Sequence, residues 1–472
     1  MIASNNKGFL HCPLCGCSHR AYVYSKLHSR IVHCTNCGLL EDINFISMHE
    51  NKIQYSMKHI LRVSALISQS KEAITLITTK GGNKSLQPLF EKICVDNRLE
   101  VVDFESLPTW SMGRSNIIVD DHLLDQRDPL ATLRLLREKM NESQNVTFLL
   151  ELVGGNYKRL RESLKIREFP ARFWPDWATF HKLLLASSFD RIWLSNLEKE
   201  KNGSKLAVVS ARIGTKRERP LVSVIMPVFN EFATFNESIE RVLKKEIPGV
   251  DTQIIVVESN STDGTKELVS RYTEHERVEI IWQKSPSGKG YAVREGLAAA
   301  KGDIILIQDA DLEYDVDDYD ALIEELTSWR STFVLGSRHT GDWKMRKFNS
   351  SPFIANVYNF GHIFFVGVIN FLIGSNMKDP FTMYKVFYRD CIHGLNFRYK
   401  RFDFDHELVI KLFRKGFHPV EIPVNYQARS FSEGKKVSIF KDGISWIQKD
   451  IQLAFEPLEN SKLHEMVHPP LP

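Results

Sequence analysis

Residues 304–311 read Ile-Ile-Leu-Ile-Gln-Asp-Ala-Asp, and this stretch decides the fold of the C-terminal half of the 472-residue chain. The apolar run predicts a buried β-strand, with Asp309 and Asp311 at its end. Side chains two positions apart on an extended backbone point to the same side, so both carboxylates can face one point. Such a pair suits a hard divalent cation, Mg²⁺ or Mn²⁺, that also binds phosphate oxygens. The alternative is an acidic turn in solvent.

The residues before this strand alternate between strands and helices. Apolar runs predict strands at 222–226, 253–258 and 278–282, with a helix after each. This alternation predicts a parallel α/β sheet, and such sheets bind ligands beyond the carboxyl ends of their strands. The polar residues expected at those ends are Glu231, Glu258, Lys289, Asp309 and Asp311.

Eight ordered segments resemble the GT-A glycosyltransferases of family 2, and among them the transferases that use polyprenyl phosphates. The segments are MPVFNE at 226–231, VVESNSTDGT at 256–265, GKGYAVREG at 288–296, KGDIILIQDADLEYD at 301–315, VLGSR at 334–338, DPFTMYKVF at 379–387, EIPVNY at 421–426 and SEGKK at 432–436. The resemblance implies a mixed, mostly parallel GT-A sheet with helices on both faces. It also implies a nucleotide-diphospho-sugar donor and transfer of the sugar with inversion.

The resemblance assigns roles on the donor side. Pro227, Asn230 and Glu231 would border the nucleotide, Glu258 would contact its base or ribose, Asp263 would shape the same pocket, and Lys289 would lie near the phosphates. Asp309 and Asp311 would hold Mg²⁺ or Mn²⁺, with Glu313 reaching the same ion. For Lys289 a solvated position at a helix start is the alternative. Its neighbours Gly288 and Gly290 permit close backbone approach and favour the phosphate role.

On the acceptor side the resemblance implies a cradle for the phosphate of a polyprenyl phosphate. Its members would be Arg338, Arg346 and Ser350, with a second basic cluster at Arg429, Lys435 and Lys436. Planar guanidinium groups suit phosphate oxygens, so these residues favour an anionic acceptor. A basic surface without a ligand is the alternative.

A growing cell-surface glycan is the other acceptor that the sequence leaves open. A sugar hydroxyl needs a general base, whereas a phosphate monoester is already an anion and needs none. Asp379 is the candidate base, because it begins a segment whose equivalent acid in the family lies near the reaction centre. Its alternative role is to cap a turn before Pro380.

Residues 360–373 form an apolar run that is too short to cross a bilayer, which needs about 20 apolar residues. The run predicts either a buried core helix or a helix lying on a membrane surface. With no signal-peptide pattern at residues 1–7, we expect a cytoplasmic protein, or one peripheral at the inner face of the membrane. The net charge of +4 gives no reason to expect nucleic-acid binding.

The N-terminus carries Cys12, Cys15, Cys34 and Cys37 in the spacing Cys-x2-Cys-x18-Cys-x2-Cys. Two Cys-x2-Cys pairs at this spacing predict one structural, tetrahedral Zn²⁺ in a zinc ribbon over residues 1–44. Free thiols or disulfides are the alternative.

Residues 45–213 show a second α/β pattern, which resembles a Rossmann-like class I methyltransferase domain. The loop that would hold S-adenosylmethionine is reduced to Gly81-Gly82, and Asp103 is the one candidate for the ribose contact. We therefore expect a degenerate scaffold domain, then a linker at 214–220, a glycosyltransferase domain at 221–456 and a tail at 457–472. An active S-adenosylmethionine-dependent methyltransferase and a zinc-ribbon interaction protein remain alternatives of another class.

Overall fold

The computed structural model describes residues 12, 14–15, 17, 20–26, 29–34, 36, 40–42, 73–78, 99–108, 115–120, 123, 126, 128–141, 144–153, 176–199, 204–338, 352–427 and 439–458. The chain divides into two compact units, one built mainly from residues up to Lys216 and the other from Arg217–Asn460. Residues 214–220 contain no helix or strand.

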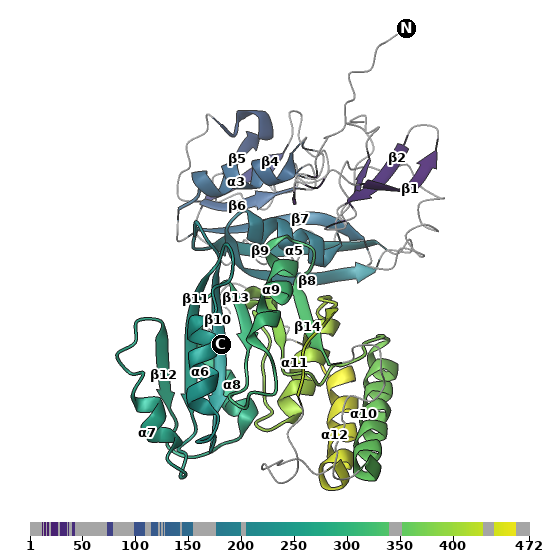
Figure 1. Ribbon diagram of the computed structural model, residues 1–472. Helices are drawn as coiled ribbons and strands as arrows, with labels where there is room; N and C mark the ends of the chain where they lie inside the picture. The colour runs from purple at the N-terminus through teal and green to yellow at the C-terminus, as the bar shows by residue number, and fades with distance from the viewer. Residues whose placement is uncertain are drawn as a thin grey trace. The chain divides into compact units, whose positions relative to one another are not determined.

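The first unit contains two sheets (Figure 1). β1 (Arg20–Lys26), β2 (Ser29–Cys34) and β3 (Leu40–Asp42) form an antiparallel sheet. The second sheet has the order β5-β4-β6-β7-β9-β8 and consists of β4 (Ala73–Thr78), β5 (Leu99–Asp103), β6 (Ser115–Val119), β7 (Asn145–Val153), β8 (Phe189–Lys199) and β9 (Ser204–Ile213). In this sheet β9 runs antiparallel to β7 and β8, and the other neighbouring strands are parallel.

Among the residues described in this unit, two helices and a short 3-10 helix, η1 (Phe104–Ser106), accompany the six-stranded sheet. α3 (Pro129–Lys139) begins where Asp128 accepts a hydrogen bond from the N–H of Ala131 at 2.9 Å, with proline in the first helical position. α5 (Trp177–Ala186) packs on α3 and β8. The α/β class predicted for this region is confirmed. The Gly81-Gly82 loop lies outside the described residues, so the expected degeneration of the S-adenosylmethionine site stays a prediction.

The second unit is built on one sheet of seven strands in the order β12-β11-β10-β13-β15-β14-β16. The strands are β10 (Leu221–Val228), β11 (Asp251–Glu258), β12 (Val278–Trp282), β13 (Ile304–Ile307), β14 (Phe333–Ser337), β15 (Lys385–Tyr388) and β16 (Val420–Pro423). β15 runs antiparallel to β13 and β14, while the other neighbouring pairs are parallel. This is the mixed, mostly parallel sheet that the sequence predicts.

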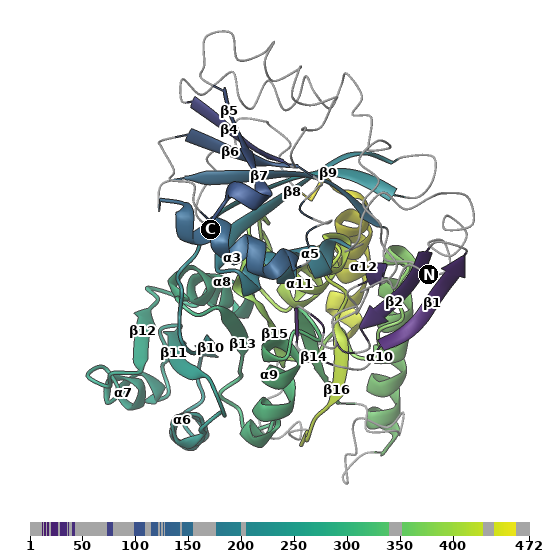
Figure 2. The same ribbon diagram turned by 90° about the horizontal axis from the view of Figure 1, so that it is seen from above.

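Helices cover both faces of this sheet. Figure 2 shows α6 (Phe235–Lys244) and α9 (Tyr319–Thr327) on one side, and α8 (Lys289–Ala299) and α11 (Asp403–Arg414) on the other. α7 (Thr265–Ser270) packs on α6, and two 3-10 helices, η3 (Val316–Asp318) and η4 (Arg389–Ile392), follow strand ends. β13 and β14 are buried along their whole length, as their continuous apolar sequences require.

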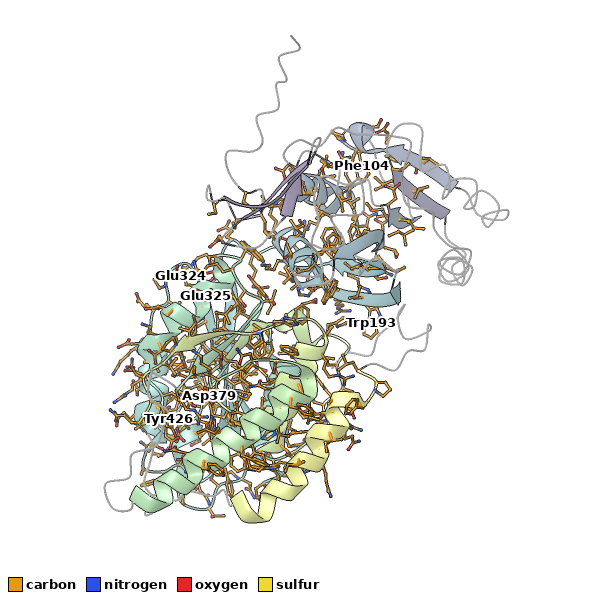
Figure 3. The ribbon with its side chains drawn as sticks, turned by 90° about the vertical axis from the view of Figure 1, so that its right-hand side faces the viewer. Phe104, Trp193, Glu324, Glu325, Asp379 and Tyr426 are labelled. Atoms are coloured by element: carbon orange, nitrogen blue, oxygen red, sulfur yellow. The ribbon has the colours of Figure 1, made fainter. Side chains whose placement is uncertain are left out.

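Two long helices complete the second unit. α10 (Pro352–Ile373) and α12 (Ile439–Phe455) lie side by side and pack on α11 (Figure 3). α10 begins earlier than the apolar run at 360–373, because residues from Pro352 onward extend the helix in front of that run. Within the described part of the chain, no helix combines the length and apolar character needed to cross a membrane.

Candidate active site

A cavity of about 720 Å³ lies at the carboxyl ends of the central strands of the second unit. The residues that follow β10, β11 and β13 line it, together with the start of α8 and side chains of α10, α11 and α12. Seven predicted site residues face this one cavity: Pro227, Glu231, Lys289, Asp309, Asp311, Glu313 and Arg338. The topology gathers them because parallel strands end at the same edge of the sheet.

Two predicted donor residues hold the neighbouring loops together and do not line the cavity. Asn230, at a positive φ of 53°, donates its backbone N–H to Ser261 Oγ at 3.0 Å and accepts the N–H of Thr262 at 2.9 Å. Asp263 accepts the N–H of Phe232 at 3.1 Å. Burial alone would raise the pKa of Asp263, but hydrogen bonds from Thr265 and Phe232 lower it below its usual value. These contacts fix the loop after β10 against the loop after β11.

Glu258 has a different role from the predicted contact with the base or ribose. Its side chain is fully buried and is absent from the cavity lining. Its carboxylate accepts the backbone N–H groups of Asn260 at 3.0 Å and Ser261 at 2.7 Å. Both oxygens are therefore engaged in the turn after β11, and the neighbouring Ser259 is the residue that lines the cavity.

Lys289 and Asp309 form an ion pair on the cavity wall. Nζ of Lys289 lies 2.6 Å from Oδ2 of Asp309, and their side chains keep 18% and 15% of their surface exposed. Burial and the nearby carboxylate of Asp311 raise the pKa of Asp309 to about 6, although Lys289 opposes the shift. An added cation would relieve this unfavourable environment, so the acid pair fits a metal electrostatically.

The other two candidate metal ligands, Asp311 and Glu313, are held in place by neighbouring groups. Asp311 Oδ1 accepts the N–H of Glu313 at 3.1 Å, and Glu313 Oε2 accepts the hydroxyl of Tyr426 at 3.0 Å. Among the described residues, no group of three or more His, Cys, Asp or Glu is close enough to hold a metal without help. Mg²⁺ and Mn²⁺ do not require such a group, because they take one or two carboxylates plus substrate phosphates and water.

Arg338 and Asp379 form a second ion pair, and this one is closed. Arg338 donates Nε to Oδ2 at 2.8 Å, Nη2 to Oδ1 at 2.7 Å and its backbone N–H to Oδ2 at 2.9 Å. The side chains are 7% and 0% exposed. Tyr426, labelled with Asp379 in Figure 3, covers the guanidinium at 5.3 Å from ring centroid to Cζ.

The closed pair corrects the expected role of Asp379. Burial would raise the pKa of Asp379, but the charge and hydrogen bonds of Arg338 outweigh it and hold that pKa well below its usual range. A carboxylate with such a low pKa and both oxygens occupied is a poor proton acceptor. Asp379 instead fixes Arg338 in the cavity wall. The other predicted acceptor residues, Arg346, Ser350, Arg429, Lys435 and Lys436, lie outside the described residues.

One further wall of the cavity, which we call the far wall, was not predicted from the sequence. His406 of α11 and Trp446 of α12 line it together with Phe381 and with His362 and Phe365 of α10. The spacing of these residues along the chain gives no signal, because they meet only when three helices pack together.

Two glycines join the donor loop to α11. A Cβ on Gly288, at a φ of +99°, would lie 2.5 Å from the carbonyl oxygen of Lys400. A Cβ on Gly290 would lie 2.4 Å from Cβ of Phe404. The start of α8 therefore packs closely against residues 400–404, which lead into α11, while the phosphate role expected of this loop stays a prediction.

The predicted zinc ligands are described only in part. The backbone N–H of Cys12 donates to the carbonyl of Cys17 at 2.8 Å, and Cys34 ends β2. Cys37 and the side chain of Cys34 lie outside what the structure describes, so the Zn²⁺ site remains a prediction.

Residues 223–392 match the family model described as Glycosyl transferase family 2. This part of the chain is therefore a family 2 glycosyltransferase domain, which contains the donor loops and both ion pairs. The match ends before α11 and α12, so His406 and Trp446 of the far wall lie outside it.

Several curated proteins are similar to the same half of the chain. Glycosyltransferase AglD of Haloferax volcanii is 25% identical, over 47% of this chain and 35% of its own. The dolichol-phosphate mannosyltransferase of Pyrococcus furiosus is 28% identical, over 45% of this chain and 58% of its own. The dolichyl-phosphate beta-glucosyltransferase ALG5C of Trichomonas vaginalis is 26% identical, over 48% of this chain and 69% of its own. The chain spans 35% and 58% of the first two.

One of the solved structures that are similar to this chain is described here. Glucosyl-3-phosphoglycerate synthase from Mycobacterium tuberculosis, in complex with Mn²⁺, UDP-glucose and phosphoglyceric acid, is 20% identical and covers 49% of this chain and 80% of its own, with a TM-score of 0.38. We draw no conclusion from a likeness at this TM-score.

Proposed function

We propose that the second unit transfers a sugar, with inversion, from a nucleotide-diphospho-sugar in a reaction that requires Mg²⁺ or Mn²⁺. The observation that carries the proposal is the convergence of Lys289, Asp309, Asp311 and Glu313 on one cavity beside the loops after β10 and β11. Transfer from such a donor builds negative charge on the departing diphosphate. A lysine and a metal-binding carboxylate pair supply the charges that this step needs.

Asp309, Asp311 and Glu313 would hold the ion. When bound, a divalent cation would neutralise the diphosphate oxygens and so improve the leaving group. Lys289 would contact the same phosphates once Asp309 turns to the ion. Tyr426 keeps Glu313 in place through its hydroxyl.

Two acceptor classes fit the cavity. A polyprenyl phosphate is supported by the names of the dolichyl-phosphate relatives and by Arg338 in the wall. A hydroxyl acceptor, such as the end of a glycan, requires a base other than Asp379. Arg338, the described cation that would bind an acceptor phosphate, already pairs with the carboxylate of Asp379.

We also propose that α10 contacts a membrane surface. It exposes Phe360, Phe364 and Phe371 by 73%, 51% and 87%, and the adjacent α12 exposes Phe455 by 74%. Large apolar side chains exposed along a helix pair suit the interface of a lipid bilayer. Sedimentation with anionic lipid vesicles tests this proposal: replacing Phe364 and Phe371 with Glu should release the protein, while Val420→Glu, at an exposed position of β16, should not.

Donor binding and turnover test the proposed reaction. Calorimetric titration with UDP- and GDP-sugars should show binding that depends on Mn²⁺ and is lost in EDTA. Asp311→Ala should lower turnover about 10²–10³-fold, the loss typical of one charge-stabilising group. Asp317→Ala is the matched control, because that acid is 79% exposed. Full turnover by Asp311→Ala would reject the proposed metal site.

For the first unit we propose a structural Zn²⁺ at the cysteine pairs and a scaffolding role. Metal analysis of the purified chain should find one Zn²⁺, and a flat titration with S-adenosylmethionine would exclude the methyltransferase alternative.

A further inference from the structure

His406 and Asp450 form a pair in the far wall of the cavity. Nδ1 of His406, on α11, lies 2.9 and 3.1 Å from the two carboxylate oxygens of Asp450, on α12. Both residues are buried, with 4% and 0% of their surface exposed. They are 44 residues apart in the chain, so helix packing alone brings them together.

The rings around His406 fix its orientation. Its imidazole lies 4.5 Å from the ring of Phe381 and 5.4 Å from that of Trp446, centroid to centroid. Since Nδ1 is engaged by Asp450, Nε2 is the ring nitrogen left for a ligand in the cavity that His406 lines. A carboxylate that holds Nδ1–H in this way keeps Nε2 as a proton acceptor and stabilises the imidazolium that forms.

The other acids near this pair have cationic partners. Asp405 faces the buried Lys385 at 3.2 Å, and Asp379 is closed by Arg338. Asp403 pairs with Lys449 of α12. His362, from α10, faces Asp379 with Nε2 at 3.8 Å, too far for a hydrogen bond.

Among the described residues of this wall, His406 is therefore the one whose imidazole is oriented by a hydrogen-bonded carboxylate. Asp379 and Asp405 are ion-paired with cations, whereas the imidazole of His406 is paired with the carboxylate of Asp450. Its place in the cavity wall, on helix α11 beyond the family match, suits an acceptor-binding role.

We infer that His406, positioned by Asp450, is the general base of the transfer and that the acceptor is a hydroxyl group. The hydroxyl oxygen bonds to the anomeric carbon while its proton moves to Nε2 of His406. The bond from that carbon to the diphosphate breaks, and the nucleoside diphosphate leaves with the electron pair. The inference rests on the proposed glycosyl transfer and selects the hydroxyl class over the phosphate class, which needs no base.

The test compares acceptors and variants of the full chain with Mn²⁺ and the sugar nucleotide that binds it best. Octyl glycosides and water serve as hydroxyl acceptors, and dolichyl phosphate in detergent serves as the phosphate acceptor. His406→Asn should lower kcat for octyl glycosides and for donor hydrolysis about 10²–10⁴-fold, the usual contribution of a general base. Its Kd for the nucleoside diphosphate with Mn²⁺ should not change.

The pH profile separates a base from a structural residue. Wild-type kcat should rise with pH through one ionisation that is absent in His406→Asn. Asp450→Asn should lower kcat about 10²-fold or more, because it disturbs the tautomer of His406. His418→Asn, at an exposed ring stacked on Phe413, should leave the profile unchanged.

Three results would overturn the inference while leaving the donor site intact. They are full turnover by His406→Asn, an unchanged pH limb in that variant, and a wild type that binds donor but glycosylates dolichyl phosphate alone or no acceptor at all. Failure of the wild type to bind any sugar nucleotide with Mn²⁺ would instead reject the proposed function itself.

Discussion

Two ion pairs in the same cavity wall differ in how completely they are closed. Asp379 binds Arg338 through both carboxylate oxygens and is 0% exposed, whereas Asp309 meets Lys289 at a single oxygen and keeps 15% of its side chain exposed. Their pKa values move in opposite directions: that of Asp379 lies well below its usual range, and that of Asp309 rises to about 6.

This difference separates a structural pair from one that is ready for a ligand. A closed, buried pair has already exchanged hydration for protein contacts, so removing one partner leaves an uncompensated charge. The open pair keeps an acid that is poorly satisfied by the protein and would gain from a further cation. Sequence cannot separate them, because each consists of one acid and one base far apart in the chain.

The largest expected effect is on the closed pair. Asp379→Ala should lower the free energy of unfolding by about 3–5 kcal/mol, because Arg338 would remain buried without its partner. Urea unfolding measures this loss. The double variant Arg338→Met with Asp379→Leu should recover most of it, because apolar side chains replace the whole pair. A loss of less than about 1 kcal/mol in the single variant would break the comparison.

The same change in the open pair should affect function more than folding. Asp309→Ala should lower sugar transfer about 10²-fold or more through loss of charge stabilisation, yet cost under about 1 kcal/mol of unfolding free energy. Turnover and urea unfolding on one preparation give both values. Strong destabilisation without loss of transfer would assign Asp309 to the structural class.

Removing the lysine of the open pair should have a smaller effect. Lys289→Met should reduce kcat/KM for the donor about 10–100-fold, because one of two cationic groups near the phosphates is lost. Lys284→Met, at an exposed position before the same loop, is the control and should keep wild-type kinetics. If both variants had the same kcat/KM for the donor, Lys289 would have no role in donor binding.

The smallest effect is the pH dependence of stability. The raised pKa of Asp309 means that the folded state binds this proton more tightly than the unfolded chain, so wild-type stability should rise as pH falls through about 6. Asp309→Asn should lose this slope. The lowered pKa of Asp379 acts oppositely: its contribution is present above the unfolded value of about 3.9 and is lost below it. Urea midpoints between about pH 4 and pH 7 measure the Asp309 slope, and midpoints below about pH 4 measure the loss of the Asp379 contribution.

Much of the donor side was predictable because short-range rules govern it. Strand ends can be inferred from apolar periodicity, and parallel strands place their following residues at one edge, so Asp309, Asp311 and Lys289 were found together. The same rules cannot say which carboxylate oxygens are already engaged. Glu258 was therefore predicted to contact the nucleotide, and Asp379 to accept a proton. The carboxylate of each already accepts hydrogen bonds from other groups of the protein.

The far wall was beyond prediction for another reason. His406, Asp450 and Trp446 come from two helices whose packing depends on contacts distant in sequence. Helical periodicity reveals that such residues face inward, but not which neighbour they meet. The long helix α10 was likewise identified by its apolar half alone, since its first turns carry no comparable run.

Gly288 and Gly290 let the start of α8 pack against the carbonyl oxygen of Lys400 and the side chain of Phe404, just ahead of His406 in the chain. A single methyl group added at Gly290 would act as a wedge and shift the recognition of both substrates together. Substitutions that change specificity for the sugar alone, or for the acceptor alone, are therefore expected at other positions. A change at this contact would shift both sides of it.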